Sequence, residues 1–228
     1  MNTPWKALLS HVVCLVAAMT LAGCGSKTPP SADPAPAAAE AQAPGAGVYG
    51  DPVVPVAGRV LGTVIHTQDA EELRYVVLKE LTDRYAAEQG ITVTQAEKEA
   101  YAAQVREALS KDPAVAAMLV EESAEDQAAR LEIAEAFILQ WKINRALYQK
   151  YGGRIGFQQG GPEPLDAYRQ FLEERQAAGD FSIENDALAA EFWRYYRDDS
   201  IHSFFEAGSA DEAKAFGVEP WASAAHSG

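Results

Sequence analysis

Apolar residues recur at steps of three and four along most of the chain after residue 66, which is the spacing of one face of an α-helix. Glycines, prolines and residue types that cap helices stand between these stretches. Thr94 and Glu97, for example, have the spacing of a capping box, in which each side chain binds a backbone N–H at a helix start. The pattern predicts helices over about 69–90, 94–110, 124–151, 162–179 and 185–196, and a last helix after Ser209.

A β-like pattern is confined to 59–65, where Gly62 indicates a tight bend, while the loop 154–161 has room for a short strand. We therefore predict an all-α fold, mainly helical, with one short strand pair at most. The helices form one domain over 58–217, a length compatible with a single hydrophobic core. Residues 218–228 are predicted to be a flexible tail.

The start of the chain has the layout of a secretory signal peptide, predicted over residues 1–23. Lys6 precedes an apolar run, 7–20, that is too short to span a bilayer comfortably. The tetrapeptide 21–24, Leu-Ala-Gly-Cys, resembles the lipobox of bacterial lipoproteins. This resemblance implies that Cys24 becomes the first residue of the mature protein and carries acyl chains, which anchor it in the lipid bilayer.

The residue after the cysteine is Gly25 rather than Asp. By resemblance to enterobacterial lipoproteins, this argues against retention at the inner membrane. We therefore expect a lipid-anchored protein of the cell envelope, at the outer membrane and facing the periplasm. Residues 24–57 are predicted to be a disordered linker, because they are rich in Ala, Pro and Gly and contain little apolar surface to bury. A flexible coil of this length spans roughly 30 Å.

The chain contains two cysteines, Cys14 and Cys24. The first leaves with the signal peptide and the second is consumed by lipid, so the folded part has no thiol. This excludes disulfides, cysteine nucleophiles and cysteine-based zinc sites. Without the signal peptide, 18 basic residues stand against 33 acidic ones, a net formal charge of −15. Such an acidic chain is a poor candidate for binding nucleic acid.

Two segments carry a resemblance to a known family. Residues 60–67, Val-Leu-Gly-Thr-Val-Ile-His-Thr, and 90–97, Gly-Ile-Thr-Val-Thr-Gln-Ala-Glu, resemble the N-terminal helical domain of SurA-type periplasmic chaperones. The resemblance implies that the chain binds unfolded or partner polypeptides. Many such domains are fused to a parvulin-type prolyl isomerase module, for which this chain has no room. Residues 152–157, Gly-Gly-Arg-Ile-Gly-Phe, resemble one parvulin turn, but the surrounding catalytic strands are missing.

Other chemistry finds little support in the sequence. After the signal peptide the histidines are His66, His202 and His226, and no two have the helical spacing of a metal pair. We predict no metal, no cofactor and no catalytic residue, and leave enzymatic activity open. His202 stands close to Asp198, Asp199 and Glu206, which favours either base chemistry or, more simply, a histidine at an acidic helix end.

Six aromatic residues gather within fourteen positions near the C-terminus. They build either a small core or an exposed surface for polypeptides, and Trp141 belongs to the same candidate set. A basic patch of Lys142, Arg145, Lys150 and Arg154 is either a partner contact or a solvated helix end. The candidate polypeptide-binding residues are Phe192, Trp193, Tyr196, Phe204, Phe205 and Trp141.

These observations predict a membrane-anchored periplasmic lipoprotein that binds polypeptides in the manner of a chaperone and assists the folding of envelope proteins. Two alternatives stay open. One is a peptidyl-prolyl cis-trans isomerase or its degenerate remnant, and the other is a structural or scaffold lipoprotein of the envelope.

Overall fold

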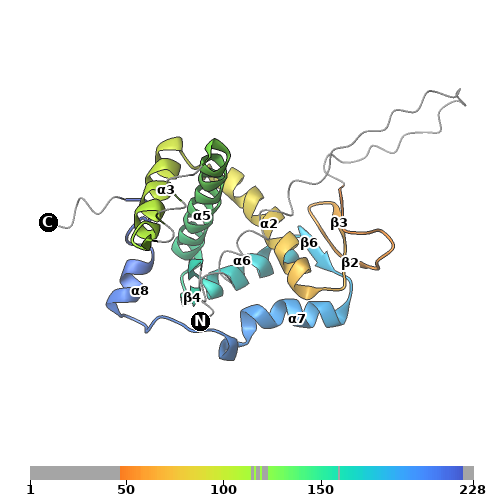
Figure 1. Ribbon diagram of the computed structural model, residues 1–228. Helices are drawn as coiled ribbons and strands as arrows, with labels where there is room; N and C mark the ends of the chain where they lie inside the picture. The colour runs from red at the N-terminus through yellow and green to blue at the C-terminus, as the bar shows by residue number, and fades with distance from the viewer. Residues whose placement is uncertain (1–46, 114–115, 117–118, 120–122, 159, 223–228) are drawn as a thin grey trace, which may run out of the picture. The chain divides into compact units, whose positions relative to one another are not determined.

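Helices and short strands make up the described part of the chain (Figure 1). The computed structural model describes residues 47–113, 116, 119, 123–158 and 160–222. The predicted signal peptide, Cys24 and the predicted linker as far as residue 46 lie outside these residues. Lipid attachment at Cys24 therefore stays a prediction from the sequence.

The β-like stretch near residue 60 is a hairpin at the centre of a mixed sheet. Its strands, β2 (Val56–Val60) and β3 (Thr63–His66), pair antiparallel. Strand β1 (Val48–Tyr49) adds parallel to β3, and β6 (Phe181–Ile183) adds antiparallel to β2. The order across the sheet is therefore β1-β3-β2-β6, so a strand from the C-terminal half closes against the N-terminal hairpin.

The hairpin depends on glycine at two positions. Leu61 and Gly62 form its two-residue turn, and both have positive φ, 48° and 88°. Such turns match the twist of the flanking strands, and glycine adopts this conformation without steric cost. Gly58 is required for a different reason, because a Cβ there would overlap the carbonyl oxygen of Ser182 on β6.

The prediction of a mainly helical fold is confirmed, but the all-α class and the limit of one strand pair are wrong. The described residues are mainly helical, but they also contain the four-stranded sheet and a separate pair, β4 (Gly156–Gln158) with β5 (Gly161–Glu163). Strands of two or three residues are shorter than the four to eight over which an alternating pattern shows. Strands β1 and β6 are therefore invisible to pattern analysis.

Both predicted boundaries of the domain also need correction. The linker was predicted to run to residue 57, yet β1 and the first residues of β2 belong to the sheet, and Ala57 is fully buried. The tail was predicted to start at residue 218, yet Trp221 is 5% exposed. All described residues fall in one compact unit.

The main helices agree with the apolar pattern because their starts and ends are locally encoded. Helix α2 ends at Gly90, which is left-handed, and Thr94 makes both bonds of its capping box with Glu97 at the start of α3. The fourth helix begins later than predicted, because residues 161–163 pair as β5. The helices are α2 (Ala70–Gln89), α3 (Gln95–Leu109), α5 (Ala124–Tyr151), α6 (Leu165–Ala177), α7 (Asp186–Arg197) and α8 (Ala210–Ala215), with a 3₁₀ turn η1 (Asp199–Ile201).

Two hydrophobic clusters hold these elements together. The larger one packs α2, α6 and α7 against the sheet and includes Leu81, Phe171 and Phe192. The smaller one lies where α3, α5 and the chain after α8 meet, and its buried members include Ile138 and Trp141. Helix α5 contributes to both, since Ile143 and Leu147 belong to the larger cluster.

The close approach of β2 and β6 gives a stability prediction. Gly58→Ala lowers the free energy of unfolding by about 1–3 kcal/mol, as overpacking does in tight interiors. Gly160→Ala is the matched control, because a Cβ at Gly160 meets no atom within 4 Å. Urea unfolding of both variants measures the difference. Equal stability of the two would show that β6 does not approach β2 this closely.

Candidate functional site

The three candidate polypeptide-binding residues on α7 are core residues. Phe192, Trp193 and Tyr196 are all buried, and their rings pack edge-on or tilted against one another at 5.3–6.2 Å. They lie on the face of α7 that meets α2, α6 and β6. The hypothesis that they form an exposed surface is therefore wrong, because the sheet and neighbouring helices cover that face.

The other three candidates lie in a different part of the fold. Trp141 is buried in the smaller cluster, whereas Phe204 and Phe205 are half-buried after η1. The Arg154 guanidinium lies 4.4 Å from the centre of the Phe204 ring, and Phe205 meets the exposed Phe157 edge-on at 5.8 Å. The six residues therefore do not make up one surface.

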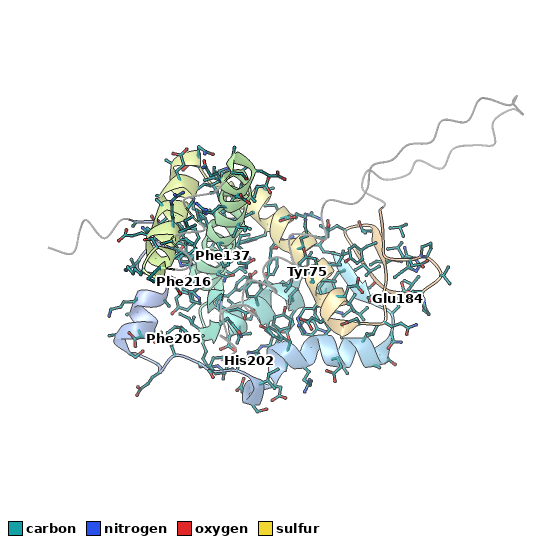
Figure 2. The ribbon with its side chains drawn as sticks, viewed as in Figure 1. Tyr75, Phe137, Glu184, His202, Phe205 and Phe216 are labelled. Atoms are coloured by element: carbon teal, nitrogen blue, oxygen red, sulfur yellow. The ribbon has the colours of Figure 1, made fainter. Side chains whose placement is uncertain are left out.

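An apolar cavity of about 250 Å³ opens beside Trp141. We call it the aromatic pocket. Tyr101 of α3 and Phe137 of α5 both line it and pack against each other, with ring centres 6.1 Å apart, and both are half-exposed. Figure 2 shows Phe137 near the α3–α5 pair and Tyr75 apart from it, on α2. The lining of the aromatic pocket consists of Tyr101, Phe137, Ile138, Trp141, Gly160, Gly161, Pro162, Pro220 and Trp221.

Local sequence explains how the aromatic pocket is built. Phe137, Ile138 and Trp141 are spaced so that they share one face of α5. The opposite side comes from the turn between β4 and β5, where Gly161 has φ +113°. Pro162 is fixed there, because the Asn144 amide donates a 2.9 Å hydrogen bond to its carbonyl oxygen.

Two cations lie over tryptophans of the pocket lining, Lys142 over the Trp221 ring and Arg145 over the Trp141 ring. Lys142 pairs with Glu97 at 2.6 Å and Arg145 with Glu219 at 3.3 Å. Burial acts to raise the pKa of Glu97, but hydrogen bonds from Lys142 and Thr94 outweigh it and lower the pKa overall. Each of these two cations beside the apolar lining is therefore paired with a carboxylate.

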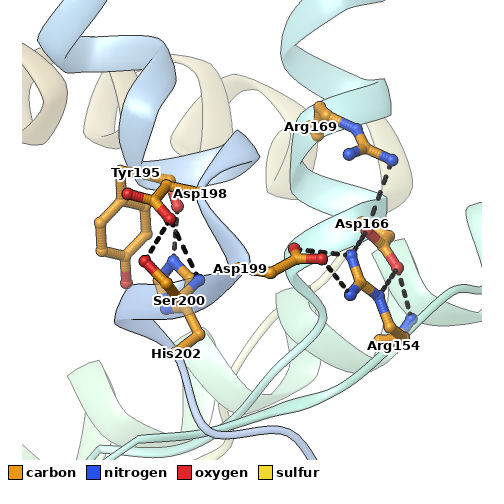
Figure 3. Close-up of polar contacts among 8 residues, drawn as sticks. All are labelled: Arg154, Asp166, Arg169, Tyr195, Asp198, Asp199, Ser200 and His202. Atoms are coloured by element: carbon orange, nitrogen blue, oxygen red, sulfur yellow. Dashed lines mark hydrogen bonds and ion pairs between the residues drawn. The ribbon is translucent and has the colours of Figure 1, made fainter.

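The predicted basic patch is not a free cationic surface. Lys150 lies 3.5 Å from Glu174, and Arg154 binds two carboxylates. Figure 3 shows this second arrangement, in which Arg154 bridges Asp166 on α6 and Asp199 in η1. The guanidinium of Arg154 holds the pKa of Asp166 below its usual range. Arg154 therefore ties the loop before β4 to two other elements.

A second set of polar contacts, partly buried, also supports the β4–β5 pair. The Tyr168 hydroxyl donates to Asn144 at 2.7 Å, and Gln140 donates to both residues. The Tyr195 hydroxyl donates to the Glu163 carboxylate at 2.8 Å. Burial of that carboxylate raises its pKa despite the hydrogen bond. These contacts hold β5, and with it Pro162, in place.

The two described histidines each contact a backbone carbonyl oxygen. The Nε2 atom of His202 lies 2.6 Å from the carbonyl oxygen of Tyr195, and its ring packs edge-on against the Tyr195 ring. The Nδ1 atom of His66 lies 2.6 Å from the carbonyl oxygen of Val54. Among the described residues, no group of three or more His, Cys, Asp or Glu side chains is placed to hold a metal ion. His226 lies outside the described residues.

Within the described ranges, none of the helices combines the length and apolarity that a bilayer-spanning segment requires. Comparison of the chain with protein-family models, with curated proteins and with solved structures finds no match. The resemblance to SurA-type chaperones thus rests on the sequence motifs alone.

Sequence reasoning missed most of the aromatic pocket. Phe137 and Trp141 stand at i and i+4 on the predicted third helix, which was a usable signal for a shared face. The predicted tail, 218–228, contained the stronger of the two missed signals. A tryptophan at position 221 is an unusual residue for a chain end that makes no contacts, because a large aromatic ring gains much from burial.

The raised pKa of Glu163 predicts a pH effect on stability. The folded state keeps the Glu163 proton to a higher pH than the unfolded state, whose pKa is about 4.3. The resulting stabilisation is present below that value and is lost as pH rises through the folded pKa. Glu163→Gln, which can still accept from Tyr195, therefore unfolds at a higher temperature than the wild type at neutral pH.

Thermal unfolding between pH 4 and pH 8 tests this prediction. The control is Glu191→Gln on the exposed face of α7, which should change stability by less than about 0.5 kcal/mol. A Glu163→Gln variant that is less stable than the wild type at neutral pH would show that the carboxylate is well solvated.

Proposed function

We propose that this chain is a membrane-anchored, periplasmic lipoprotein that binds unfolded polypeptide in the manner of a chaperone. The observation that carries the proposal is the aromatic pocket, a half-exposed apolar site between α3, α5 and the β4–β5 turn. Concave sites lined by apolar and aromatic side chains are where proteins commonly bind other molecules.

The size and lining of the aromatic pocket favour polypeptide over a small molecule. Its volume of about 250 Å³ lies below the roughly 300–1,000 Å³ of typical small-molecule sites. Among the described residues that line it there is no charged side chain, so its interior favours apolar groups over a charged ligand. Such a site suits one or two apolar side chains of an extended chain, and it selects them by apolar character rather than by shape.

The sequence supplies the cellular context of the proposal. The lipobox resemblance at Cys24 supports an acyl anchor at the outer membrane, and the Ala/Pro-rich linker supports a domain held away from the bilayer. A net formal charge of −15 after signal removal keeps such a protein soluble beside its clients.

The isomerase alternative gains no specific observation. It depended on residues 152–157, in which Gly153 and Gly156 have a packing role. A Cβ at Gly153 would overlap the Asp166 side chain, and a Cβ at Gly156 would lie 2.8 Å from Leu165 Cδ1. Close packing against α6 therefore accounts for Gly153 and Gly156 without catalysis. For the scaffold alternative, the part of the chain that the structure describes gives no observation that favours it specifically.

Tyr101→Ala tests the proposal against a matched tyrosine. Truncating an aromatic residue at the centre of a contact costs about 1–2 kcal/mol, so the affinity for an unfolded polypeptide should fall roughly five- to thirtyfold. Tyr75→Ala is the control, because Tyr75 is 38% exposed and lies outside the aromatic pocket. The measurement uses full-length protein in phospholipid nanodiscs and a labelled, chemically unfolded periplasmic protein, followed by fluorescence anisotropy.

A companion assay separates binding from chaperone action. Sedimentation of the aggregated client should show protection by the wild type and by Tyr75→Ala, and weaker protection by Tyr101→Ala. Equal binding by both variants would remove the aromatic pocket from the mechanism, and absence of binding by the wild type would refute the proposed function.

A further inference from the structure

The chain that follows α8 crosses to the aromatic pocket. We call residues 217–222, Gly-Val-Glu-Pro-Trp-Ala, the C-terminal segment. Pro220 and Trp221 of this segment form part of the pocket's lining. Trp221 is 5% exposed, whereas the residues on either side of it are exposed. Trp221 is therefore the one buried side chain within residues 217–222.

The C-terminal segment is held by contacts of the kind that peptide-binding proteins use. The Trp221 ring stands edge-on to Trp141, with ring centres 5.1 Å apart and planes at 85°. The Lys142 ammonium lies 5.4 Å from the centre of the Trp221 ring, within cation–π range. The deep part of the site thus accepts an aromatic ring between an aromatic partner and a cation.

Two polar contacts bind the residues of the segment on either side of Trp221. Arg145 Nη1 lies 3.3 Å from the Glu219 carboxylate, two residues before the tryptophan. The Gln104 amide of α3 donates a 3.1 Å hydrogen bond to the Ala222 carbonyl oxygen. One contact selects an acidic side chain and the other a main-chain carbonyl, which any extended polypeptide offers.

We propose that the aromatic pocket is a peptide site occupied by the chain's own C-terminal segment, and that a client segment with an acidic residue two positions before an aromatic residue displaces it. This inference rests on the proposed function and deepens it. It names the chemistry of the client segment and the internal competitor that the client must replace.

Displacement is physically reasonable for this segment. One buried ring must offset the entropy of ordering the residues around it, so the closed state is only modestly favoured. Helix α8 has six residues, and Val218 after it is 61% exposed. The cavity of about 250 Å³ that remains beside Trp221 shows that the segment does not fill the site. A client with a second apolar side chain has room to bind better.

A labelled peptide with the sequence of residues 217–222 is the probe, and full-length protein in nanodiscs is the receptor. Trp221→Ala should bind the peptide at least tenfold more tightly than the wild type, because the tethered competitor is weakened. Val218→Ala is the matched control in the same segment and should bind like the wild type. Replacing the tryptophan of the peptide by alanine should abolish binding to Trp221→Ala.

A charge swap tests the acidic preference. In the Trp221→Ala background, Arg145→Glu should weaken binding of the peptide and strengthen binding of a peptide with arginine in place of its glutamate. The Arg145–Glu219 pair is exposed, so each effect should be about two- to fivefold. Equal binding of both peptides by Arg145→Glu would overturn the acidic preference.

A measurement on the unaltered protein covers the case in which Trp221→Ala misfolds. Saturation of the wild type with the peptide should accelerate amide hydrogen exchange in 217–222 while leaving α7 protected. Unchanged exchange at saturation would overturn the displacement, and so would failure of the peptide to bind a Trp221→Ala variant with a wild-type unfolding temperature.

The results also separate this inference from the proposed function. If Trp221→Ala binds the peptide but no variant holds an unfolded client, the peptide site stands and the chaperone role fails. If the wild type holds a client and saturating peptide does not compete, the chaperone role stands and the displacement is refuted.

Discussion

The packing of α5 in two hydrophobic clusters at once is the constraint on which the rest of the structure depends. Ile143 and Leu147 enter the cluster beside the sheet, while Ile138 and Trp141 enter the cluster beside α3. The helix can do this because, at about 3.6 residues per turn, the first pair stands on nearly the opposite side of α5 (Ala124–Tyr151) from the second. The aromatic pocket is consequently fixed relative to the sheet by one rigid element rather than by a loop.

Polar contacts then fix the elements that α5 does not reach through apolar packing. Asn144 stands on α5 between the two clusters and binds Pro162, so the β4–β5 turn is held at the pocket. Arg154, in the loop before β4, binds Asp166 and Asp199. Buried or half-buried polar groups are costly unless they are paired, and here the pairing restricts the β4–β5 turn to one position.

The parts of the fold that were predictable from sequence are those encoded by neighbouring residues. The capping box at Thr94 and the stop at Gly90 are satisfied within a few residues, so the sequence reports them directly. Pairing of β6 with β2 joins residues about 120 positions apart, and no local sequence pattern predicts it. The same limit applies to Trp221, whose partner Trp141 lies 80 positions earlier. The lipid anchor at Cys24 and the linker before residue 47 stay predictions.

The aromatic residues show why composition alone could not identify the site. Phe192 and Phe137 belong to the same residue type, and each lies on an amphipathic helix. Phe192 is buried because the face of α7 meets three other elements, whereas Phe137 is half-exposed because its face of α5 meets α3 and a cavity. The C-terminal segment forms part of the pocket lining, and no disulfide holds it, since residues 217–222 contain no cysteine. Because non-covalent contacts alone hold the C-terminal segment, a ligand that binds the site more tightly than the segment does can displace it.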